Sequence, residues 1–176
     1  MAADSPKAAV DEFLRPLRRA LSCITDEYLA GGYDPARSPK LVFPSAQENG
    51  YIRLRGDHPI EFRLIHGYNI TQDEDGWAVH TTSYSYDFQL DNGREVVVYH
   101  FDPRPRSKVK TPHLQARGLI DPLPLSKAHF PTGRVSIEEV IRFAITDLGV
   151  RPRHENGIWQ THLAETEKEF FAKKRW

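Results

Sequence analysis

The chain has 176 residues, of which 39% are hydrophobic and 11% aromatic, with 24 Lys and Arg balanced by 24 Asp and Glu. This length and composition predict one folded domain, residues 1–176, with a hydrophobic core, and they exclude a disordered chain. A net charge of zero excludes a uniformly basic coat of the kind that binds nucleic acid, but it leaves room for a local basic patch.

Cys23 is the single cysteine, so an internal disulfide and cysteine-based zinc sites are excluded. The first residues lack the basic start and apolar run of a secretory signal, and no stretch approaches the roughly 20 apolar residues that cross a bilayer. We therefore expect a cytoplasmic protein without a membrane segment.

Residues 1–32 are predicted to form an N-terminal helix. Apolar side chains recur there at three- and four-residue steps, from Val10 to Tyr28, which is typical of a helix that packs one face on a core. Ser5 and Pro6 suit the helix start, and the glycine pair at 31–32 suits its end. Pro16 leaves two alternatives: a helix kinked at this residue or one that begins there.

Residues 50–101 are predicted to form an antiparallel sheet. Apolar and polar residues alternate around Ile52 and around Phe62, and the segments 77–90 and 94–101 are rich in β-branched and aromatic residues. Between these last two segments lies Asp91-Asn92-Gly93, a strong hairpin signal.

Residues 102–133 read as a basic, proline-rich loop with one short extended segment near 109–114. Residues 134–172 read as a helical pair. Ser136 and Glu139 form a capping box for the first helix, and the second is expected at about 158–171. The sequence thus predicts an α+β fold, in which an antiparallel sheet of about four to five strands packs against an N-terminal helix and two C-terminal helices.

The turn of the hairpin decides which side chains share a face. A two-residue turn at Asn92-Gly93 pairs Leu90 with Glu95, Tyr86 with Tyr99, and Ser85 with His100. One face is then an aromatic core, and the other carries Ser85, Asp87 and His100, with Asp87 diagonal to His100. A three-residue turn would instead slip the register by one and place His100 among the tyrosines.

His100 is a candidate catalytic base on the open face, and the alternative is a structural histidine bonded to a hydroxyl. Ser85, Asp87 and His100 are not predicted to be a hydrolase triad, because such a nucleophile usually stands on a strained turn and not in the middle of a strand.

Residues 103–120 contain no acidic residue. Such a segment beside the open sheet face predicts a phosphate-binding site, and the alternative is a basic loop that only aids solubility. Its cations are Arg104, Arg106, Lys108, Lys110 and Arg117.

No metal or cofactor site is predicted. The histidines lack the helical spacing of zinc proteases, although distant histidines can converge in space, and no nucleotide-binding glycine motif is present.

Four short motifs resemble the core of the TumE-like toxins of bacterial toxin-antitoxin modules. They are Tyr84-Ser85-Tyr86-Asp87, Asp91-Asn92-Gly93-Arg94, Tyr99-His100 and Pro112-His113-Leu114, which match Y-x-Y, D-G-R, Y-[DH] and P-H. The segment 129–136 before the capped helix looks like a companion segment of that group. In the family a further histidine follows P-H, whereas Leu114 and Gln115 follow here, which speaks against a site of several histidines.

The resemblance implies a small toxin that acts on RNA and is neutralised by an antitoxin protein encoded beside it. Metal-independent RNA cleavage needs a base, an acid and cations, for which we predict His100, His113, and Arg104 with Arg106, while Asp87 orients His100. Lys108, Lys110 and Arg117 would add to RNA binding. The alternative is a non-enzymatic module that binds nucleic acid or protein, and a third class is a structural subunit.

Overall fold

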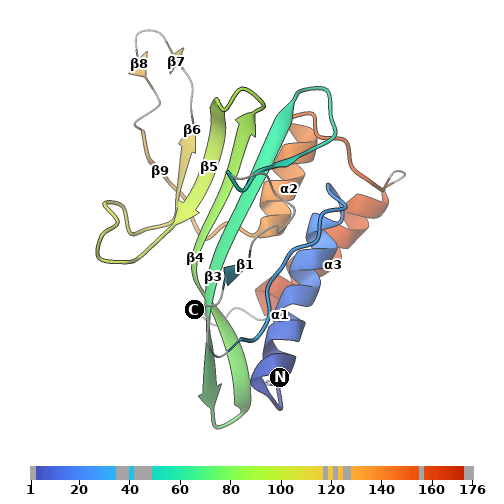
Figure 1. The fold of residues 1–176 in the computed structure, drawn as a ribbon, viewed down its shortest axis with the longest axis vertical. Helices are drawn as coiled ribbons and strands as arrows, with labels where there is room; N and C mark the ends of the chain where they lie inside the picture. Colours follow the sequence, from blue (N-terminus) through green and yellow to red (C-terminus); the bar gives the residue numbers. More distant parts are fainter. Residues whose placement is uncertain are drawn as a thin grey trace.

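The computed structural model describes residues 3–34, 40–41, 49–116, 119–120, 123–124, 128–154 and 157–172. Figure 1 shows the course of the chain. Its elements are, in chain order, α1 (Pro6–Leu21), β1 (Lys40–Leu41), β2 (Ile52–Arg53), β3 (Ile60–Asp73), β4 (Gly76–Leu90), β5 (Glu95–Phe101), β6 (His113–Ala116), β7 (Leu119–Ile120), β8 (Leu123–Pro124), β9 (Phe130–Pro131), α2 (Ile137–Thr146) and α3 (Ile158–Ala172).

The protein has the predicted α+β fold, with an antiparallel sheet, one N-terminal helix and two C-terminal helices. The main sheet follows the order β1-β3-β4-β5-β6-β9, and β2 pairs separately with β3, which gives more strands than predicted. β6 and β9 come from the segment 102–133, which was predicted to be a loop with one short extended segment near 109–114; β6 overlaps the end of that extended segment, and β9 was not predicted. Both segments are too short to show a clear periodicity in the sequence. They are strands because β6 pairs with β5 and β9 pairs with β6.

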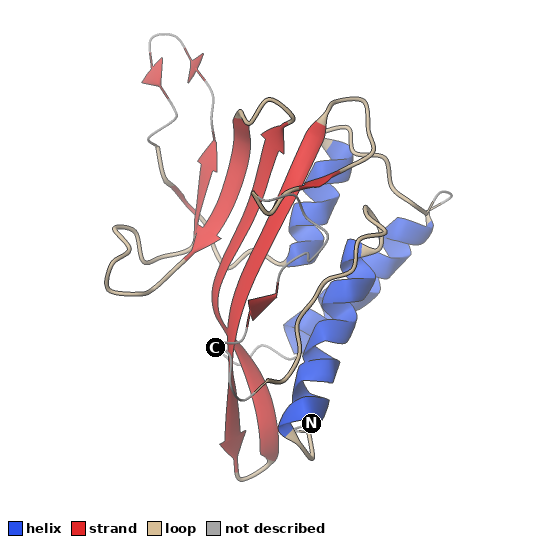
Figure 2. Cartoon of the chain, viewed as in Figure 1, coloured by secondary structure: helices blue, strands red, loops and turns tan. Residues whose placement is uncertain are grey.

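The helices lie on one side of the main sheet (Figure 2). They cover the face that carries Tyr84, Tyr86 and Phe88 of β4, and these side chains share a buried core with Val10 of α1 and Val140 of α2. The aromatic face is therefore the core, and the alternate residues of β4 and β5 point to the opposite face.

Helix α1 begins at Pro6, where the side chain of Ser5 caps it by accepting a hydrogen bond from the Ala8 N–H, and it runs through Pro16. The helix ends at Leu21, so the predicted end at the glycine pair is wrong. Backbone hydrogen bonds from Cys23 to the Ala20 carbonyl and from Ile24 to the Leu21 carbonyl turn the chain there. The capping box of Ser136 and Glu139 at α2 is confirmed.

The β4–β5 hairpin has a three-residue turn and not the predicted two-residue turn. The Leu90 N–H donates to the Arg94 carbonyl, and the N–H of Gly93, with φ of 78°, donates to the Leu90 carbonyl. Glu95 accordingly pairs with Gln89 and not with Leu90. A bulge then shifts the register between Phe88 and Gln89, and it cancels the slip that the longer turn would cause.

Candidate functional site

The outer face of the sheet carries one polar row that crosses three strands. Beyond the bulge, β4 and β5 pair as predicted, with Ser85 opposite His100 and Tyr86 opposite Tyr99. On the next strand, His113 is the direct partner of His100. His100 therefore lies on the face opposite the aromatic core, as the sequence predicts.

Three histidines from distant positions meet on this face. The ring centroids of His100 and His113 are 5.2 Å apart, and those of His113 and His129 are 4.9 Å apart. We call His100, His113 and His129 the histidine row. No histidine directly follows Pro112-His113 in the sequence, but His129, just before β9, lies beside His113 in the fold. Sequence analysis did not select His129, and the pairing of β6 with β9 is what brings it near.

The three rings differ in exposure, and this divides their possible roles. His113 is only 2% exposed, and its Nδ1 donates a hydrogen bond to the Thr111 carbonyl over 2.8 Å. His100 is half-buried and His129 is exposed, with the Gln115 amide nitrogen 2.9 Å from its Nδ1. A buried ring cannot contact the leaving group of a substrate, so the structure does not favour the predicted acid, His113.

The pKa of His100 lies below the usual histidine value. Burial is the largest cause, and the neighbouring His113 lowers the pKa further, while the carboxylates of Asp102 and Asp87 oppose the shift. The ring is therefore neutral at pH 7 and able to accept a proton.

Asp87 is 2% exposed, and its hydrogen bonds go elsewhere than to His100. Arg63 binds Oδ2 through Nε at 2.8 Å and through Nη2, and the Ser85 hydroxyl donates to Oδ1. The Arg63 guanidinium also lies over the ring of Tyr51, 4.7 Å from its centroid. Asp87 thus acts on His100 through its charge, and the predicted orienting contact is not among its hydrogen bonds.

The basic segment is less uniformly available than the sequence suggests. Arg104 is held by Asp102, with Nε 2.8 Å from Oδ1 and Nη2 2.6 Å from Oδ2. Asp102 directly precedes the acid-free segment and stands two residues before Arg104. This spacing could have predicted the ion pair between them. Arg104 is therefore not the uncompensated phosphate clamp that was predicted.

Three of the other predicted cations lie on the same exposed loop. Arg106, Lys108 and Lys110 are exposed, while Arg117 lies outside the described residues. An open pocket joins this loop to the histidine row, and its lining consists of His100, Asp102, Arg104, Pro105, Arg106 and Ser107. The half-buried histidine and an exposed arginine thus face a common space.

Within the described parts of the chain, no group of three or more His, Cys, Asp or Glu side chains is arranged to hold a metal ion. No helix found there has the length and apolar character needed to cross a membrane.

Comparisons with known proteins give no relative from which a function could be transferred. No protein-family model matches the chain, and searches of curated proteins and of solved structures find no match.

Proposed function

We propose that this protein is the toxin of a toxin-antitoxin module and acts in the cytoplasm as a metal-independent endoribonuclease. The observation that carries the proposal is the histidine row, which places His100 and His129 on either side of the buried His113, next to the pocket shared with Arg106. The resemblance of the motifs around Tyr84 and His100 to TumE-like toxins supports the same function.

The proposed reaction is transfer of a phosphodiester to the neighbouring 2′-hydroxyl. His100, neutral at pH 7, takes the 2′-hydroxyl proton as that oxygen bonds to phosphorus. The bond from phosphorus to the 5′-oxygen breaks, and the His129 imidazole gives a proton to that oxygen. The products are a 2′,3′-cyclic phosphate and a free 5′-hydroxyl.

The remaining residues of the site position these groups and offset charge. His113 stands between the two reacting rings and is fixed by its hydrogen bond to Thr111. Arg106, Lys108 and Lys110 would hold the phosphate and the flanking RNA backbone, since they are exposed on the loop beside the pocket.

The test is cleavage of a short labelled single-stranded RNA in the presence of EDTA. Wild-type protein should produce cyclic-phosphate ends, and His100→Ala and His129→Ala should each lower the rate by about 100-fold or more. His58→Ala is the control, because His58 is exposed and outside the row. If His100→Ala and His129→Ala both cleave at the wild-type rate, the proposed catalytic site is wrong. If the wild-type protein binds RNA but does not cleave it, a non-enzymatic binding module is favoured.

The antitoxin is the second part of the proposal. Expression of the wild-type chain alone should arrest bacterial growth, and co-expression of the protein encoded next to it should restore growth. His100→Ala should be tolerated without that partner. Equal growth arrest by His100→Ala and by wild type would separate toxicity from the histidine row.

A further inference from the structure

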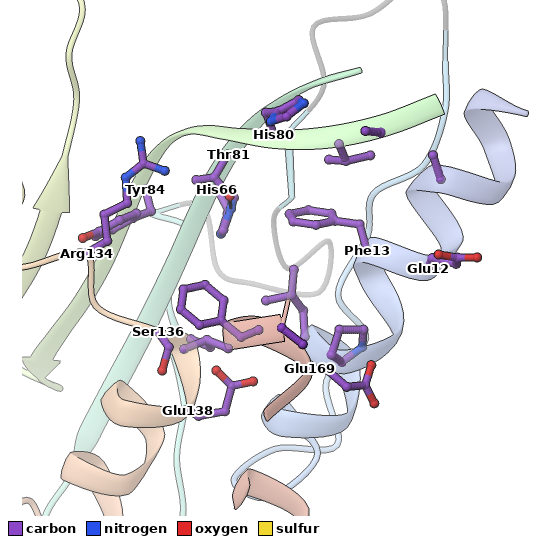
Figure 3. A pocket seen from close by; sticks show the side chains of 18 of the residues that line it. Glu12, Phe13, His66, His80, Thr81, Tyr84, Arg134, Ser136, Glu138 and Glu169 are labelled. Carbon is purple, nitrogen blue, oxygen red and sulfur yellow. Dashed lines mark hydrogen bonds between the residues drawn. The ribbon is translucent and has the colours of Figure 1, made fainter. Parts of the chain in front are cut away.

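A cavity of about 320 Å³ lies on the helix-covered side of the sheet (Figure 3), and its lining includes no residue of the histidine row. Its volume falls at the lower end of the range for small-molecule sites. Half-buried apolar side chains contribute to its wall: Phe13 and Leu17 of α1, Trp77 and Val79 of β4, and Phe170 of α3.

The carboxyl group of Glu138, near the start of α2, lines this cavity and is incompletely bonded. Glu138 is only 2% exposed, and its Oε2 atom has no hydrogen-bond partner among the described residues. Figure 3 shows the carboxyl group directed toward the side chains that surround the cavity. A buried acceptor without a donor costs about 1–3 kcal/mol, so a donor supplied by a ligand would remove a real penalty.

The charges around the cavity favour a cationic donor. Glu12 and Glu169 also line it, with Glu169 paired to Arg15 at 3.5 Å, and the basic residues of the lining within the described part of the chain are Arg134, His66 and His80. His66 adds no positive charge at pH 7, because burial lowers its pKa to about 4 and its two ring nitrogens are bonded to the hydroxyls of Tyr86 and Thr81.

The aromatic wall suits the same kind of ligand. The faces of aromatic rings attract cations, and groups of such rings recognise organic ammonium ions. Phe13, Trp77 and Phe170 supply rings from three different elements, while Glu138 supplies the acceptor.

We propose that the cavity binds a small organic ammonium ion with an apolar body, whose N–H groups donate to Glu138 while its body packs among Phe13, Trp77 and Phe170. This site is separate from the histidine row, and it stands or falls independently of the proposed ribonuclease function.

The test is a titration of the full chain with small organic probes. Binding is measured by calorimetry and by the change in chemical shift of the Trp77 indole N–H in NMR spectra. The probes are 2-phenylethylammonium, cyclohexylammonium and hexylammonium, with 2-phenylethanol and 3-phenylpropanoate as neutral and anionic matches. We expect at least one ammonium ion to bind in the millimolar range or tighter, the alcohol at least about 10-fold more weakly, and the carboxylate not at all.

Two variants locate the site. Glu138→Gln should weaken ammonium binding by about 10-fold or more, and it should reduce the difference in affinity between the ammonium ions and the alcohol. Leu17→Trp should block the binding of every probe by filling the cavity. Glu27→Gln is the control for charge, because Glu27 is exposed and does not line the cavity. Absence of binding by all three ammonium ions, equal binding of the alcohol, or unchanged affinity in folded Leu17→Trp would each overturn the proposal.

Discussion

His100 and His113 are direct cross-strand partners, and their rings meet edge to face with centroids 5.2 Å apart. Two imidazoles at this separation cannot both take up a proton without mutual repulsion. The buried His113 thus helps to keep the more accessible His100 neutral, and this coupling is a property of the β5–β6 pairing.

His113→Phe should raise the pKa of His100. Phenylalanine keeps a ring in the buried position but removes the group whose positive charge lowers that pKa. The measurement is an NMR titration of the His100 Cε1–H signal. As a comparison of opposite sign, Asp102→Asn should lower the pKa, because the Asp102 carboxylate raises it. No change in His113→Phe would mean that His113 does not contribute to the lowered pKa of His100.

The hairpin shows why the sequence predicts part of this site and not all of it. The pairing of Ser85 with His100 is correct although the predicted turn is wrong, because a three-residue turn and a bulge at Phe88/Gln89 cancel. Local turn preferences cannot reveal such a bulge, which depends on the facing strand. The helices, marked by caps at Ser5 and Ser136, were more readily predicted because capping is local.

The site residues divide in the same way. His100 could be chosen from alternation within one hairpin, whereas the burial of His113 and the approach of His129 depend on β6 and β9, which pair across a long connection. The ion pair of Arg104 with Asp102 was missed because charge was counted only within the acid-free segment.

Gly56→Ala should destabilise the fold by about 1–3 kcal/mol. A Cβ at this position would collide with the Gly149 carbonyl oxygen, which is backbone and cannot move aside easily. Gly56 also bridges to Val150, so the strain would weaken the contact between the β2–β3 connection and the segment after α2. Gly32→Ala is the matched control, since no atom lies within 4 Å of its added Cβ. Chemical denaturation gives the free energy of unfolding of both variants. Equal stability of the two variants would contradict the close approach of Gly56 to the Gly149 carbonyl.

Stability should fall as the pH drops from about 6.5 to about 4, in part because of His66. Burial lowers the pKa of this histidine from 6.5 to about 4, so between these values the unfolded chain binds a proton that the folded chain does not. The contribution of His66 is therefore complete above pH 6.5 and lost toward pH 4, by up to about 3 kcal/mol.

His66→Gln tests this dependence, because glutamine can still bond to the hydroxyls of Tyr86 and Thr81 but does not titrate. Urea denaturation at pH 7, 5.5 and 4.5 should show a smaller loss of stability in this variant than in wild type. His58→Gln replaces an exposed histidine and should retain the wild-type pH dependence. If His66→Gln loses as much stability as wild type over this range, other groups cause the acid sensitivity and His66 is not held neutral by burial.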